Sequence, residues 1–487
     1  MDKKLKSNIL KGSAATSIGT ITGMVFQFFT IMIFTRYVSK DDLGIYVLVL
    51  VIVNMFNLLG GLGVELTMVK FIASKKEEDN QDVLLPVLLI RAFGSILFSL
   101  IFILTGRYIL HLFDDRIYQY IWYILAIFIL ANYRDLFYNL MQGLHQFKQY
   151  SIVNVTSSAF RVFVVVLFIM FSKLDIKLLL IIEILATCQP LIHQLFVIPF
   201  KKYLRVMPTR ETFRKIIKFS IPVYLNNLVD FANGQMNVFI IGLYLAPVSV
   251  ANYDIARKVP VAFGKIFGAF KVVYFPHLVS LFSTGDKKTA VKLIEKSIGA
   301  FSIAMAFLFP FTFLFRHELT TLLFSARYSE VALAFTLLIF NFFLKGIGNL
   351  MGYAFLPAGY PSIPTWINTW TSIIGLGMSL LLVPVYGYMG AVYSIIINNF
   401  ITTTLSYLYL LKHSINPRVK FFLKPAMLFM LAPISLLFAG EYLILMDSLL
   451  LVIILVLGWF ISDELKKGVR HLIKYIKNYI SAKNATT

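Results

Sequence analysis

Apolar runs of about 20 residues recur from one end of the 487-residue sequence to the other. A helix of that length crosses a hydrocarbon core of about 30 Å and satisfies its own backbone groups in lipid. Charged residues make up only 14% of the sequence, against about 25% in soluble proteins, and 59% of the residues are hydrophobic. The sequence therefore predicts an all-α polytopic membrane protein.

Runs bounded by charges, proline or glycine predict about 14 transmembrane helices, with twelve as the alternative count. The expected spans cover residues 14–35, 43–64, 83–105, 118–140, 150–171, 178–198, 219–243, 249–277, 297–315, 330–355, 363–383, 388–411, 425–440 and 445–461.

Basic residues are unevenly distributed between the two sets of predicted loops. One set of loops and chain ends holds 29 of the 45 lysines and arginines, the other set holds 8, and 8 lie inside predicted spans. Because cytoplasmic loops carry the excess of Lys and Arg, we expect a multi-pass protein of the cytoplasmic membrane with both termini in the cytoplasm. Over residues 465–480, apolar residues and lysines recur at helical spacing. This predicts a basic amphipathic helix on anionic membrane lipids, with a solvated tail as the alternative.

The longest polar stretch in the middle of the chain, 201–218, carries seven basic residues and divides the predicted helices into two sets. A weak repeat pairs Tyr46 with Tyr253, each after the first helix of its half. Two lobes with the same membrane orientation would be related by an axis along the membrane normal. The expected parts are an N-lobe of helices 1–6 (1–200), a basic cytoplasmic linker (201–218), a C-lobe of helices 7–12 (219–412), and helices 13–14 with the basic tail (413–487).

The sequence carries no signature of catalysis or nucleotide binding. It contains no GxxxxGK[ST] loop, no HExxH and no CxxC motif, and its single cysteine, Cys188, offers no metal-site spacing. The net charge of +21 is spread between apolar runs rather than gathered on one domain, which argues against nucleic acid as a partner. We therefore predict that the protein is not an enzyme and uses no cofactor or metal.

Charged residues inside the predicted spans are the candidates for function, because burying a charge in lipid is costly unless it faces a cavity or a partner. Apart from acidic residues at the ends of spans, such as Asp447, the spans hold eight basic and four acidic residues, an excess that suits a phosphate or pyrophosphate headgroup. Span 249–277 is the richest. On a helical projection Asp254, Lys258 and Lys265 fall within about 40° of one another, with Arg257 about 60° away. Mutual neutralisation of Asp254 and Lys258 is the alternative.

Other spans carry isolated charges. Arg161 lies midway along its span and is expected to face a cavity, whereas Arg91 either snorkels to the interface or faces a cavity. Asp230 lies in a run of amide side chains, which predicts contact with an ion or a sugar, with pairing inside the helix bundle as the alternative. The adjacent Arg134 and Asp135 are expected to form an internal pair, unless they mark an earlier helix end.

The stretch from Thr35 to Tyr46, TRYVSKDDLGIY, follows the first span, and Gly61-Leu62-Gly63 closes the second. Together with two lobes of six helices plus two more, this pattern resembles the Wzx-type polysaccharide flippases of the multidrug/oligosaccharidyl-lipid/polysaccharide exporter superfamily. The resemblance implies a MATE-like fold, a V-shaped pair of lobes around a cavity that opens alternately to each side. It also implies movement of an undecaprenyl-pyrophosphate-linked oligosaccharide to the outer leaflet for cell-surface polysaccharide assembly, with a polysaccharide polymerase and glycosyltransferases as partners.

In related flippases, basic residues of the cavity engage the pyrophosphate, and an ion gradient or the membrane potential drives the cycle. By charge and depth, the resemblance carries pyrophosphate binding to Lys258, Lys265, Arg257 and Arg161. The candidates for ion coupling or cavity lining are Asp254, Asp230 and Arg91.

Two other functions remain open. A cation-coupled multidrug antiporter of the same superfamily would need acidic residues to bind cationic drugs, whereas the interior excess here is basic. A membrane scaffold for glycan assembly enzymes would have no use for charged residues inside the membrane.

Overall fold

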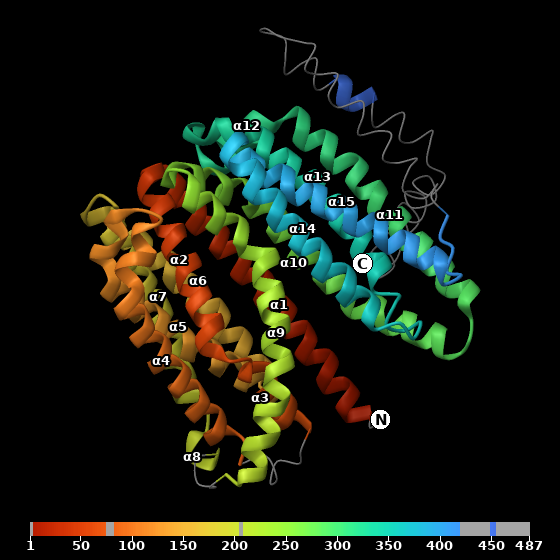
Figure 1. The fold of residues 1–487 in the computed structure, drawn as a ribbon, viewed down its shortest axis with the longest axis horizontal. Coiled ribbons are helices and arrows are strands. Elements are labelled where there is room, and N and C mark those ends of the chain that lie inside the picture. Colours follow the sequence, from red (N-terminus) through yellow and green to blue (C-terminus); the bar gives the residue numbers. More distant parts are fainter. Residues whose placement is uncertain (1–2, 75–81, 204–207, 419–448, 454–487) are drawn as a thin grey trace, which may run out of the picture. The chain divides into compact units, whose positions relative to one another are not determined.

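The protein is all-α throughout the part that the structure describes. The computed structural model describes residues 3–74, 82–203, 208–418 and 449–453, and these are 89% helical with no strand. The predicted fold class is therefore confirmed. Figure 1 labels the α-helices. In chain order the elements are α1 (Lys3–Tyr37), α2 (Lys40–Gly61), α3 (Val64–Ser74), α4 (Leu84–His111), η1 (Asp115–Tyr120), α5 (Ile121–Gly143), α6 (Phe147–Phe171), α7 (Ile176–Val197), α8 (Phe200–Tyr203), α9 (Arg210–Tyr244), α10 (Pro247–Ser283), α11 (Lys287–Leu314), α12 (Arg316–Phe324), η2 (Ala326–Val331), α13 (Ala332–Gly352), α14 (Ser362–Tyr386) and α15 (Tyr388–Lys412).

Ten helical segments of the described residues are long and apolar enough to cross a membrane, so this is a multi-pass membrane protein. The twelve predicted spans from 14–35 to 388–411 each fall on a long helix. One of these helices, α9, contains 35 residues but is too polar to be among the ten apolar segments, and α10 carries five charged residues over its 37 positions.

The last two predicted spans fall largely outside the described residues. Span 425–440 lies wholly outside them, and only 449–453 of span 445–461 is described. The count of fourteen therefore stays a prediction, and so does the amphipathic helix over 465–480.

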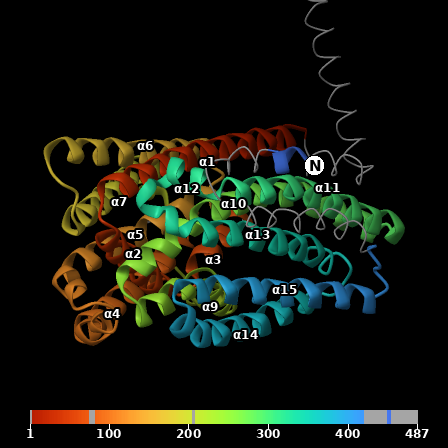
Figure 2. The ribbon, with the colours of Figure 1, turned by 90° about the horizontal axis from the view of Figure 1, so that it is seen from above.

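The chain forms two compact units, residues 1–254 with 379–391 and residues 255–378 with 392–487. In the first unit α1 packs along α6, as Figure 2 shows, and α7 packs on α5 and α6. The close approach of α1 to α6 needs a glycine, because a methyl group at Gly19 would lie 2.7 Å from Cβ of Ser151. In the second unit α11 packs against α13. The predicted lobes and their boundary at 201–218 stay predictions.

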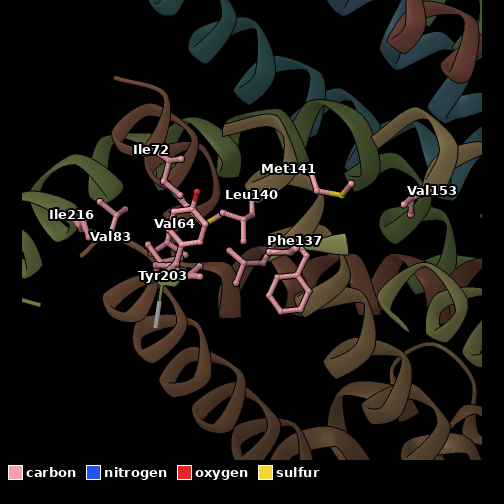
Figure 3. Packing of buried hydrophobic residues seen from close by; sticks show 14 residues of the cluster. Val64, Ile72, Val83, Phe137, Leu140, Met141, Val153, Tyr203 and Ile216 are labelled. Atoms are coloured by element: carbon pink, nitrogen blue, oxygen red, sulfur yellow. The ribbon is translucent and has the colours of Figure 1, made fainter. Parts of the chain in front are cut away.

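A buried apolar cluster joins α3, α4, α5 and α9 in the first unit. Figure 3 shows Val64, Leu140 and Ile216 among its side chains, and each is at most 1% exposed. Lys70 of α3 places Nζ 3.7 Å from the centre of the Phe219 ring on α9, a cation–π contact. These contacts fix the first half of α9 against α3.

The helix that follows α1 is broken at Leu62-Gly63. Both residues have left-handed backbones, with φ of 49° at Leu62 and 71° at Gly63, and the chain resumes as α3 at Val64. Gly61 packs closely against α4, because a methyl group there would lie 2.5 Å from Nη1 of Arg91. The predicted span 43–64 ends here, and α3 was not predicted from the sequence.

Candidate functional site

A buried ion pair joins α6 and α7 in the first unit. Arg161 of α6 donates from Nη1 and Nη2 to the two carboxylate oxygens of Glu183 on α7, both at 2.8 Å. Tyr46 of α2 donates its hydroxyl to Glu183 Oε2 at 2.5 Å. Glu183 and Tyr46 are each 5% exposed. The forked geometry is the strong form of an arginine–carboxylate contact, so the charge of Arg161 is compensated at this site.

Arg161 was predicted to face a cavity, and its partner was not predicted. In the structure its guanidinium is engaged by Glu183, and its side chain is 23% exposed. A signal for the pairing was present, because Glu183 is an acidic residue inside the next predicted span. The two residues are 22 positions apart, and the rotational setting of two helices decides whether such residues meet.

A second buried charge cluster lies at the break between α2 and α3. Arg91 of α4 is 0% exposed, so it does not snorkel to the interface. It donates from Nη2 to Glu65 at 2.6 Å and to the backbone oxygen of Asn132 at 2.7 Å. Its Nε and Nη1 have no hydrogen-bond acceptor among the described residues. Glu65 was not singled out from the sequence because it belongs to α3, the helix that the analysis missed.

The adjacent Arg134 and Asp135 of α5 form the internal pair that the sequence predicted. Arg134 Nη2 lies 2.8 Å from Asp135 Oδ1, and α5 continues past both residues to Gly143. The alternative of an earlier helix end is therefore excluded.

The remaining predicted site residues lie on α9 and α10. Asp230 of α9 is exposed. On α10, Asp254 is buried at 2% exposure, Arg257 and Lys258 are half-buried, and Lys265 is exposed. The helix carries four basic residues and one acidic residue over its 37 positions, so pairing within the helix leaves it positively charged.

Two further polar contacts in the second unit were not foreseen. Arg418 donates from Nε and Nη2 to the two carboxylate oxygens of Glu295, at 2.9 and 3.0 Å. Lys271 of α10 places Nζ 4.9 Å from the centre of the Tyr353 ring. Among the described residues, no group of three or more His, Cys, Asp or Glu side chains could hold a metal ion.

The fold is similar to that of solved membrane transporters. A structure described as the lipid II flippase MurJ in an inward closed conformation matches with a TM-score of 0.72 and 13% identity, over 93% of this chain and 99% of that chain. An inward-facing multidrug resistance MATE family transporter of the MOP superfamily matches with a TM-score of 0.68 and 14% identity, over 80% of this chain and 94% of that chain.

A third similar structure is a MOP superfamily transporter from Pyrococcus furiosus. It matches with a TM-score of 0.56 and 15% identity, over 83% of this chain and 96% of that chain. Its description states that a reversed polarity of the binding pocket suggests a different function. At these identities the similarity establishes the fold, and the predicted MATE-like architecture is confirmed.

Comparison at the level of sequence gives the family. No curated protein matches the sequence. A family model described as polysaccharide biosynthesis protein matches residues 9–282, more than half of the chain, from within α1 to the last turn of α10. The chain therefore belongs to the polysaccharide biosynthesis protein family.

Proposed function

We propose that this protein is a flippase that moves an undecaprenyl-pyrophosphate-linked oligosaccharide across the cytoplasmic membrane by alternating access. Family membership and the fold shared with a lipid II flippase support a transport role in polysaccharide assembly. Both termini lie in the cytoplasm in this proposal, and the lobes predicted at 1–200 and 219–412 move against each other.

The observation that carries the proposal is the polarity of α9 together with the basic excess of α10. Each helix is longer than the roughly 20 residues needed to cross a membrane. Helix α9 is too polar to be among the ten apolar segments of the described chain, and α10 carries four basic residues and one acidic residue. Within a membrane, polar helices of this length are stable where they line water or a polar ligand. The charge of α10 is positive, so the ligand that suits it is an anion.

Lys258 and Lys265 are the primary ligands of the pyrophosphate in this proposal, and Arg257 assists them. Ammonium and guanidinium groups bind phosphate oxygens through charge-assisted hydrogen bonds, which are stronger than neutral ones. Arg161 joins them only in a conformation in which the contact with Glu183 opens, because one guanidinium fork serves one bidentate partner at a time. Asp254 and Asp230 are the proposed coupling groups.

The test is a flipping assay in proteoliposomes. A labelled polyprenyl-pyrophosphate oligosaccharide is placed in the outer leaflet, and its protection from a membrane-impermeant reagent is followed over time. The proposal expects protection that depends on the protein and on the pyrophosphate, with little protection of a neutral glycolipid of the same chain length. Equal protection of the two lipids would show scrambling and overturn the proposal.

The second candidate is a cation-coupled multidrug antiporter, which the similarity to a multidrug resistance transporter brings into consideration. The same proteoliposomes loaded with a cationic dye separate the two functions. Dye movement under an imposed ion gradient, without flipping of the pyrophosphate lipid, would establish the antiporter instead.

A further inference from the structure

An apolar groove of about 470 Å³ lies between α4 and α9, beside the start of α3. Its walls include Leu89 and Phe93 of α4 and Ile217 and Ile221 of α9. The hydroxyl of Ser220, also at the groove, donates to Oγ1 of Thr67 at 2.9 Å and is thereby satisfied. The volume falls in the range of about 300–1,000 Å³ found for small-molecule pockets.

The walls of the groove remain accessible to the surroundings of the first unit. Leu89 is 50% exposed, Phe93 63%, Ile217 45% and Ile221 56%. Leu89 and Phe93 belong to the part of α4 that is long and apolar enough to cross a membrane, so this wall of the groove faces hydrocarbon in a bilayer. The groove is therefore a place where lipid, and not a polar solute, gains contact area.

The length of the groove matches one leaflet of a bilayer. On α9 it runs from Phe213 to Tyr224, a rise of about 16 Å at about 1.5 Å per residue. Half of a hydrocarbon core is about 15 Å thick. An acyl chain of one leaflet therefore spans the groove, whereas an undecaprenyl chain is far longer.

Two arginines lie at the end of the groove where α9 begins. Arg210 and Arg214 are both exposed, and they fall on the same side of α9 as Ile217 and Ile221, at spacings of three, four and seven. The opposite side carries Lys215, whose Nζ lies 2.6 Å from Glu211. The groove thus has a positively charged end suited to phosphate.

We infer that this groove holds one acyl chain of an anionic phospholipid whose phosphate binds Arg210 and Arg214. The lipid is a resident of the leaflet that α9 enters first, and it fills the space between α4 and α9. The polyprenyl tail of a transported lipid is the poorer occupant, because the proposed pyrophosphate ligands lie deep within α10, whereas these arginines lie in the first turns of α9. The inference goes beyond the proposed function and does not depend on transport.

The test measures lipid retention by the full-length protein in detergent. Native mass spectrometry follows the binding of added phosphatidylglycerol, with phosphatidylcholine as the neutral-headgroup comparison. We expect the double variant Arg210→Gln/Arg214→Gln to bind phosphatidylglycerol about fivefold more weakly for each charge removed, since a basic residue near anionic lipid contributes about a fivefold preference. The control Lys215→Gln removes a charge on the other side of α9 and leaves binding unchanged.

A second measurement locates the acyl chain and tests the groove itself. Phosphatidylglycerol with a photoreactive acyl chain is expected to label peptides of α4 and α9. Ile221→Trp, which fills the groove, abolishes that labelling, and Leu225→Trp, an exposed position of α9 outside the groove, preserves it. Each variant is first shown to be monodisperse by size-exclusion chromatography.

Two results would overturn the inference. Equal retention and labelling in all variants would mean that the protein carries only a general lipid shell. Displacement of the phosphatidylglycerol label from α4 and α9 by polyprenyl phosphate, but not by unlabelled phosphatidylglycerol, would assign the groove to the transported lipid.

Discussion

Two buried tyrosines that the sequence pairs in a predicted repeat lie near the starts of their helices and are followed by different charge patterns. Tyr46 is the seventh residue of α2 and Tyr253 the seventh of α10, and they are 5% and 3% exposed. Tyr46 contacts Glu183, which compensates Arg161. Tyr253 is instead followed on its own helix by an excess of basic residues. The comparison sets a basic residue held in a bidentate contact with a carboxylate beside a helix whose basic residues outnumber its acidic one, the helix to which we assign the anionic ligand in our proposal.

The largest expected effect comes from the α10 side of this comparison. Lys258→Ala/Lys265→Ala should lower flipping of the pyrophosphate lipid at least about hundredfold, because each lost charge-assisted contact is worth about 1.5–3 kcal/mol. The measurement is the initial rate of protection in proteoliposomes. Lys271→Ala is the matched control. It removes another lysine of α10, whose Nζ lies over the Tyr353 ring, and it should keep most of the rate. Full activity in the double variant would remove these two lysines from the site.

The α2 side is tested by removing the carboxylate. Glu183→Gln leaves Arg161 buried without its anion, and breaking such a pair should lower the free energy of unfolding by about 3 kcal/mol. Thermal unfolding in detergent measures the loss. The double variant Arg161→Leu/Glu183→Leu should recover most of the lost free energy of unfolding, because the cost of desolvating both charged groups is removed together with their attraction. A Glu183→Gln protein as stable as the wild type would contradict a structural role for the pair.

A smaller effect is expected at the tyrosine itself. Tyr46→Phe removes the hydroxyl that donates to Glu183 and should cost about 1.5 kcal/mol, the low end for a hydrogen bond to a charged group. Tyr37→Phe, at an exposed position near the end of α1, should leave the unfolding temperature unchanged. A similar shift in both variants would show that the bond to Glu183 contributes nothing specific.

The smallest effect is expected where arginine and carboxylate meet outside the spans. The hydrogen bond from Arg116 holds the pKa of Asp114 below its ordinary value. The carboxylate form therefore stabilises the fold above pH of about 4, and this contribution is lost as the pH falls through the lowered folded-state pKa. Asp114→Asn should cost about 0.5 kcal/mol at neutral pH, as for an exposed pair.

The same pair supplies a pH control for the comparison. The difference in unfolding free energy between wild type and Asp114→Asn should shrink toward zero when the pH is lowered below about 4. A constant difference across that range would mean that the side chain acts through its shape and not its charge.

The fold was largely predictable because membrane spans depend on length and apolar composition, which one sequence displays. The break at Leu62-Gly63, with a second helix directly after it, could not be predicted. A glycine-rich stretch can end a helix or interrupt one, and only the packing of the following segment against its neighbours distinguishes the two. The helix α3 has 11 residues, too few to cross a membrane, and includes Glu65. Its apolar run is therefore too short to be recognised as a membrane span.

The charged residues of the site could be listed from the sequence, but their partners could not. Arg161 and Glu183 are visible as intramembrane charges, whereas their meeting depends on the rotation of α6 and α7 about their axes. Arg91 illustrates the same limit, because its partner Glu65 lies on the helix that was missed. Composition predicts which charges need partners, and only tertiary packing decides which partners they find.

The buried contact between Arg91 and Glu65 has a consequence for how the protein is made. Glu65 is synthesised 26 residues before Arg91. Helix α4 is very apolar, with a mean hydropathy of 2.5 in its span. It can therefore enter the bilayer despite the cost of roughly 2.5–3.5 kcal/mol for inserting an arginine at the helix centre. Arg91 then contacts the carboxylate of Glu65 on α3, which precedes α4 in the chain. At this contact, therefore, the helix that is synthesised first carries the partner that the later helix requires.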